Sequence, residues 1–161
     1  FTDATYTSAD NSHIPTLKKH EAVGRITSFR HHLLVEFVWR DIPFGQWWTR
    51  WRIMPVTRGL LVPRAVIAEQ KVPSQFSEKQ VASYEGERVE VRWRDVVHLV
   101  NTRIRPSVMK SEGFCVAADR QKIVLQDVQT TRVSPHPEKP HAVGATRLVI
   151  PLGVCTRIKP I

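Results

Sequence analysis

Residue type alternates with a period of two in several runs of this chain, and this pattern constrains the fold more than any other feature. Successive side chains of a β-strand point to opposite faces of the sheet, so alternation of this kind predicts strands. The segment 44–54, FGQWWTRWRIM, is the strongest case. As a strand it carries Trp47 and Trp51 on one face, and Trp48 with two arginines on the other.

The alternation and the β-rich composition predict an all-β fold with five or six strands and one helix. The expected core strands are 22–29, 33–39, 46–54, 88–100, 114–118 and 122–128. The run 60–67 is also apolar, but Pro63 restricts it to an edge strand or a loop, because proline cannot donate to a sheet ladder. The spacing of apolar residues predicts a helix near 74–85, with Gly86 past its end.

A helix between the third and fourth strands is typical of an OB-fold. We therefore expect a small five-stranded OB-like barrel with one inserted helix and extended N- and C-terminal arms. The expected boundaries are residues 1–20 for the N-terminal arm, 21–128 for the barrel domain and 129–161 for a Pro-rich basic C-terminal extension. Pro-rich polar segments often become ordered only on a partner, although a short strand is expected at 146–150.

The chain is strongly basic, with 24 Lys and Arg against 15 Asp and Glu, a formal net charge of +9 and a pI near 10.2. This balance favours a partner with dense negative charge, nucleic acid first and an anionic membrane second. No run approaches the ~18 apolar residues of a membrane span, so we expect no membrane partner. Cys115 and Cys155 are expected to be buried, reduced thiols.

Residue patterns that carry catalysis are missing from the sequence. There is no phosphate-binding glycine loop, no GxGxxG, no HExxH and no GxSxG. The histidines are scattered: His31 and His32 point apart in a turn, while His136 and His141 lie in the Pro-rich segment and are expected to be solvated. We therefore expect a binding protein rather than an enzyme, with no cofactor, no metal and no small-molecule substrate.

A basic sheet with aromatic residues between its arginines fits RNA or another single-stranded nucleic acid. Guanidinium groups neutralise phosphates, and aromatic rings stack on unpaired bases. Trp48 is the best stacking candidate because arginines share its face, whereas Trp39 and Trp93 fit core packing. The segment 101–110, NTRIRPSVMK, is expected to be a basic connection between strands.

Several motifs resemble those of one family. They are GRITS at 24–28, LVEF at 34–37, FGQWWTRWR at 44–52, RP at 105–106, KS at 110–111 and FCV at 114–116. In this order they are similar to the opening hairpin, the basic strand and the ending of the ribosomal small-subunit protein family numbered seventeen, an OB-fold binder of ribosomal RNA. The resemblance covers about residues 22–118, with Gln46 where the family has lysine and with insertions before Arg88 and Arg105. Such expansions resemble those of mitochondrial ribosomal proteins.

The candidate RNA-binding residues combine the positions implied by the resemblance with the basic turn and loop residues. They are Arg25, Arg30, His31, His32, Gln46, Trp48, Arg50, Arg52, Arg103, Arg105, Lys110 and Ser111.

The leading hypothesis is a structural constituent of the ribosome that binds small-subunit ribosomal RNA in the mitochondrial matrix. Its terminal extensions would contact neighbouring ribosomal proteins. A second hypothesis is an OB-fold RNA- or single-strand-binding subunit of an RNA-processing or editing complex. A third is a protein–protein assembly module, in which the tryptophan cluster is an interface anchor rather than a stacking surface.

Overall fold

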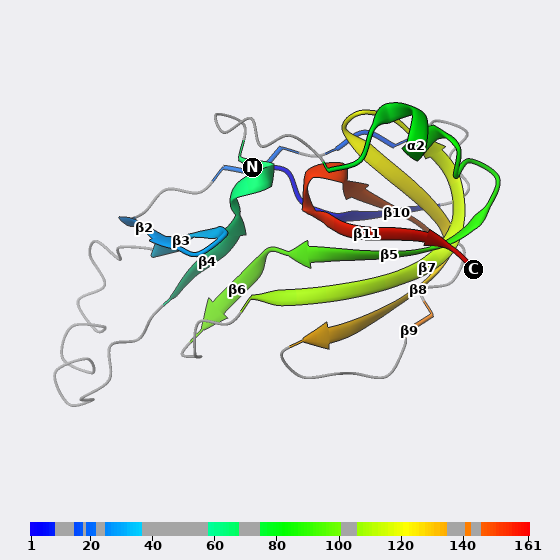
Figure 1. Cartoon of the computed structure of the whole chain (residues 1–161). Helices are drawn as coiled ribbons and strands as arrows, with labels where there is room; N and C mark the ends of the chain where they lie inside the picture. Colours follow the sequence, from blue (N-terminus) through cyan, green and yellow to red (C-terminus); the bar gives the residue numbers. More distant parts are fainter. Residues whose placement is uncertain are drawn as a thin grey trace, which may run out of the picture.

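The computed structural model describes residues 1–8, 15–17, 19–21, 25–36, 58–67, 75–100, 106–134, 141–142 and 146–161. In these ranges the chain is mostly β-structure with little helix (Figure 1). The elements are β1 (Thr5–Ser8), β2 (Arg25–Phe29), β3 (His32–Glu36), β4 (Arg58–Pro63), η1 (Arg64–Val66), α2 (Glu78–Ala82), β5 (Arg88–Asp95), β6 (Val97–Val100), β7 (Ser107–Ala118), β8 (Lys122–Ser134), β9 (His141–Ala142), β10 (Thr146–Pro151), η2 (Leu152–Val154) and β11 (Cys155–Pro160).

The strands form two antiparallel sheets. The larger sheet has the order β1-β10-β8-β7-β5-β11, with β9 paired to β8, and the smaller sheet has the order β2-β3-β4-β6. The chain passes from one sheet to the other where β5 leads through Val96 into β6. The all-β class predicted from the sequence is confirmed. Among the described strands, however, no pairing closes either sheet into a barrel.

The two sheets share one apolar core. Val35 and Leu60 of the smaller sheet belong to the same buried cluster as Val91, Ile123 and Leu148 of the larger one. Burying a branched aliphatic side chain of this size contributes roughly 1.5–3 kcal/mol, so the inner faces of both sheets stabilise the fold together.

The predicted helix is present, but it is shorter than expected. It begins at Glu78, where the Ser77 side chain accepts a hydrogen bond from the Gln80 backbone N–H at 3.2 Å. Gly86 follows it with a φ of +84°, a left-handed conformation that glycine adopts without strain. Val81 is fully buried and attaches the helix to the core.

The C-terminal segment is part of the larger sheet rather than an extension. The expected boundary after residue 128 falls inside β8, and β10 and β11 add two more strands. Leu148 and Ile150 of β10 are fully buried in the shared core. Two of the prolines that suggested an extension, Pro151 and Pro160, are the last residues of their strands, where a missing N–H disturbs the ladder least.

The N-terminal residues are also attached to the body of the protein. Strand β1 pairs with β10, and the Thr2 backbone N–H donates to the Val66 carbonyl at 3.0 Å. The Phe1 ring stacks on His20 with 5.5 Å between centroids. The expected extended arm at residues 1–20 therefore contributes a strand to the larger sheet.

Two local expectations are wrong. Strand β4 lies between β3 and β6, so it is not an edge strand. Pro63 is tolerated because pairing with β6 ends at Leu61, two residues earlier. Strand β7 begins at Ser107, so the end of the segment expected to be a connection is a paired strand that carries Lys110.

Both cysteines are buried and unpaired, as the sequence predicted. Burial, with the nearby Glu85 carboxylate, raises the pKa of the Cys115 thiol to about 11. A thiol held in its neutral form is a poor nucleophile, which fits a packing role.

A chain of hydrogen bonds runs through the interior and joins four strands. The Trp93 indole Nε1 donates to Ser111 Oγ at 3.0 Å, and that oxygen lies 2.9 Å from Thr130 Oγ1. The Tyr6 hydroxyl donates to Thr130 Oγ1 at 2.8 Å. Ser111 and Thr130 are 0% and 5% exposed, so each hydroxyl depends on the others for its hydrogen bonds.

We predict that Thr130→Val destabilises the protein by about 1–3 kcal/mol, because the change keeps the shape but removes two hydrogen bonds and leaves the buried Ser111 hydroxyl with Trp93 as its remaining partner. Urea unfolding measures the effect. Tyr6→Phe is the control: it removes a hydroxyl from a side chain that is 42% exposed, so it should cost less than 1 kcal/mol, as a partly hydrated bond does. Equal losses for the two variants would show that Thr130 does not hold the network together.

Candidate nucleic-acid interface

Strand β5 separates apolar and charged side chains onto two faces. Val89, Val91 and Trp93 are between 0% and 3% exposed and line the core. The alternate residues, among them Arg92, point to the other face, where the Arg92 side chain is 41% exposed. We call this surface of β11, β5 and β7 the outer face.

Three basic residues lie directly opposite one another on the outer face. Arg157 of β11 is the register partner of Arg92 of β5, which is also the partner of Lys110 of β7. Neighbouring strands are ~4.8 Å apart, so these three positions span about 10 Å. We call them the cation row. Like charges in directly opposite positions destabilise a sheet, so such a row has a cost that an anionic ligand would remove.

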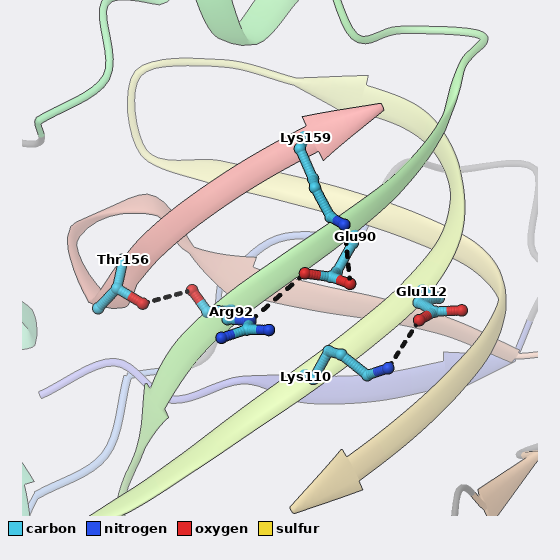
Figure 2. Close-up of polar contacts among 6 residues, drawn as sticks. All are labelled: Glu90, Arg92, Lys110, Glu112, Thr156 and Lys159. Carbon is cyan, nitrogen blue, oxygen red and sulfur yellow. Dashed lines mark hydrogen bonds and ion pairs between the residues drawn. The ribbon is translucent and has the colours of Figure 1, made fainter. Parts of the chain in front are cut away.

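Two carboxylates, Glu90 and Glu112, lie two residues along the strands from the cation row on the same face and partly balance its charge. The Arg92 Nε and Lys159 Nζ atoms lie 3.3 and 3.4 Å from the two oxygens of Glu90. Lys110 Nζ donates to Glu112 Oε1 at 2.8 Å. Figure 2 shows these ion pairs side by side, together with the hydrogen bond from Thr156 Oγ1 to the Arg92 carbonyl that holds β11 against β5.

The environment of Glu90 is strongly cationic. Burial of this carboxylate raises its pKa. Lys159 first, then Arg92 and Lys110, lower the pKa by more than burial raises it, so the pKa of Glu90 lies below its ordinary value. Glu90 is therefore ionised at neutral pH and stabilises the cations around it.

The outer face keeps an excess of positive charge after these pairs are counted. Arg157 is exposed and makes no ion pair with any residue of the described ranges. The Lys110–Glu112 pair is partly solvated, and such a pair contributes only about 0–1 kcal/mol, whereas Arg92 is itself 41% exposed but pairs with a nearly buried Glu90. Phosphate groups can therefore bind Arg157 directly and compete for Lys110 at little cost, and they can approach the exposed part of Arg92 while Glu90 stays paired.

The residues predicted at the first hairpin lie on the smaller sheet. Arg30, with a φ of +52°, and His31 form the exposed turn between β2 and β3. Arg25 lies at the start of β2. Arg64 joins this turn, since its backbone N–H donates to the His31 carbonyl at 3.0 Å and its Nη2 to Ser28 Oγ at 2.6 Å.

His32 and Ser111 are not on an exposed surface, although both were predicted to bind RNA. His32 is 3% exposed, and neither ring nitrogen has a hydrogen-bond partner in the described part of the chain. Burial, followed by Arg94 and His31, lowers the pKa of His32 to about 4, so it is neutral and cannot attract phosphate at pH 7. Ser111 faces inward because it alternates with Lys110 along β7.

Lys110 is the predicted residue that the structure places in the cation row. The remaining candidates lie outside the described residues. They are Gln46, Trp48, Arg50, Arg52, Arg103 and Arg105, together with the expected strand 46–54.

Sequence reasoning missed Arg157 and Lys159, because the Pro-rich composition suggested a tail. A signal was present: in the segment 155–160, CTRIKP, Ile158 stands between two basic residues, as in a strand with one buried face. Arg92 was also absent from the candidate binding residues, although it lies in the expected strand 88–100.

Comparisons with protein-family models, curated proteins and solved structures give no match to this chain. None of the described helices is both long and apolar enough to cross a membrane. Within the same ranges, no three His, Cys, Asp or Glu side chains are grouped so that they could hold a metal ion.

The buried His32 predicts an acid-dependent loss of stability. Because its pKa is about 4 in the folded state and 6.5 in a free side chain, the unfolded chain takes up a proton first as the pH falls. The His32 contribution to stability should therefore decrease by roughly 1–3 kcal/mol between pH 6.5 and 4, and change little below that.

The test measures the free energy of unfolding of the parent chain and of the His32→Leu variant by urea unfolding across this pH range. A difference measurement is needed because burial raises the pKa of Asp95 to about 7, and that group stabilises the fold as the pH falls. The free energy of unfolding of the variant, relative to that of the parent chain, should increase as the pH falls toward 4. A constant difference between pH 7 and 4 would contradict the assignment of a neutral, buried His32.

Proposed function

We propose that this protein binds RNA through the outer face of its larger sheet, as a structural constituent of a ribonucleoprotein particle. The cation row of Arg157, Arg92 and Lys110 is the observation that carries the proposal. Three opposed cations on one solvent-accessible surface favour a ligand with closely spaced negative charges, which a phosphodiester backbone provides.

The composition and the chemistry of the row support nucleic acid over other anions. Two of the three cations are arginines, whose planar guanidinium groups bind phosphate oxygens in pairs. The whole chain carries a formal charge of +9, which would attract a polyanion over a distance and raise its association rate.

We further propose that the RNA is small-subunit ribosomal RNA and that the protein acts in the mitochondrial matrix as a binding protein without enzymatic activity. The motifs between residues 22 and 118 support this through their resemblance to the ribosomal family. The finer description of an OB-like barrel belongs to the same proposal, which does not depend on barrel closure. The C-terminal segment would then contact RNA through Arg157 and Lys159, besides contacting neighbouring proteins.

The first test removes the positive charge of the cation row. In the triple variant Arg157→Gln, Arg92→Gln and Lys110→Gln, we expect affinity for an rRNA fragment to fall at least tenfold. The slope of log affinity against log salt should decrease by about 2, since each lost phosphate contact on a single strand contributes ~0.7. Fluorescence anisotropy at several salt concentrations measures both quantities.

The control is Lys79→Gln with Arg120→Gln, which removes two exposed cations that lie away from the outer face, on α2 and in the turn after β7. This variant should keep the affinity of the parent chain. Thermal unfolding of both variants confirms that they are folded. An unchanged affinity and salt slope in the triple variant would exclude the outer face as the RNA-binding surface.

A second test separates a ribosomal protein from a subunit of an RNA-processing complex. We expect the protein to co-sediment with the small ribosomal subunit in a fixed ratio, also in high salt, because a structural constituent is packed among RNA and protein neighbours, and salt does not screen these packing contacts as it screens phosphate contacts. Mass spectrometry of gradient fractions measures the ratio. Release from the subunit at moderate salt, or sedimentation with a different RNA, would favour the processing complex.

A further inference from the structure

Strand β7 exposes an aromatic ring at a position where the core does not need it. Phe114 is 44% exposed and lies on the outer face, whereas its neighbours Gly113 and Cys115 are buried. A single exposed apolar side chain is common on a protein surface, so the residues beside Phe114 decide what its exposed ring can bind.

The ring lies beside a guanidinium group. Arg88 is the register partner of Phe114 on β5, and its Cζ atom lies 5.8 Å from the ring centroid. An arginine over an aromatic ring offers two flat surfaces and a positive charge at one place. The flat surfaces suit a nucleobase, and the charge suits the phosphate attached to it.

Phe114 is aligned with the cation row. Lys110, Glu112 and Phe114 are alternate residues of β7 and therefore share the outer face. Phe114 lies four positions after Lys110 along the strand, a distance of ~13 Å. A nucleotide chain whose phosphates contact the row can therefore reach the ring within a few nucleotides.

We propose that Phe114, together with Arg88, is a stacking site for an unpaired base, so that the ligand of the outer face is single-stranded RNA rather than a duplex. This inference rests on the RNA interface proposed above and specifies its substrate class. Bases in a duplex are stacked on one another and offer no free face to a protein side chain, whereas an unpaired base stacks readily on an aromatic ring.

The experiment compares single-stranded RNA with a blunt RNA duplex of the same length, both labelled with fluorescein, by fluorescence anisotropy. Phe114→Ala should weaken binding of the single strand by roughly 5- to 100-fold, the range that one stacked base provides. Its affinity for the duplex should not change. The salt slope should also stay constant, because the substitution removes no charge.

Two matched variants separate stacking from a general effect. Phe114→Trp keeps a flat ring and should keep the affinity for the single strand. Val116→Ala shortens another exposed apolar side chain of β7, 39% exposed, and should have little effect. The midpoint of thermal unfolding is expected to be nearly unchanged in Phe114→Ala, Phe114→Trp and Val116→Ala, since each altered side chain is substantially solvated.

The outcomes distinguish this inference from the function on which it rests. If the parent chain binds neither RNA, the RNA-binding function itself is wrong. If the parent chain binds RNA and Phe114→Ala leaves the affinity for the single strand unchanged, or weakens both RNAs equally, the stacking site is wrong and the cation row remains.

Discussion

Burial of Val89, Val91 and Trp93 on the inner side of β5 determines where this chain presents its positive charge. Side chains of a strand alternate, so packing these three into the core forces Glu90 and Arg92, which lie between them, to the opposite surface. Pairing with β7 on one side and β11 on the other then extends that surface across three strands. The core and the binding surface are two consequences of one periodic pattern, and a shift of register by one residue would exchange them.

The balance of charge on the outer face explains how the sheet tolerates its own repulsion. Glu90 lies between the Arg92 and Lys159 side chains and is almost buried by them, so the free protein keeps the cations in place. The Lys110–Glu112 pair is partly exposed to water and therefore weak, and Arg157 makes no ion pair with any residue of the described ranges. A phosphate backbone can add its charge without rebuilding the surface, which is a form of preorganisation.

Sequence patterns predicted the all-β class, the central helix and the burial of Trp93, because each depends on local alternation or spacing. They did not predict that the C-terminal segment completes the larger sheet, because its proline content suggested an extension. In the structure, Pro160 is the last residue of an edge strand. The inward direction of Ser111 was also missed. Ser111 lies between the expected connection 101–110 and the expected strand 114–118, so no face was defined for it, and only the register of β7 with β5 and β8 shows that its side chain is buried.

The most direct test of the central claim is a lysine acetylation footprint with and without bound RNA, measured by mass spectrometry. Lys110 and Lys159 lie on the outer face, while Lys79 is exposed on α2 and serves as an internal reference. The account predicts that RNA protects Lys110 and Lys159 and leaves Lys79 reactive. Full binding of RNA with unchanged reactivity of Lys110 and Lys159 would contradict it.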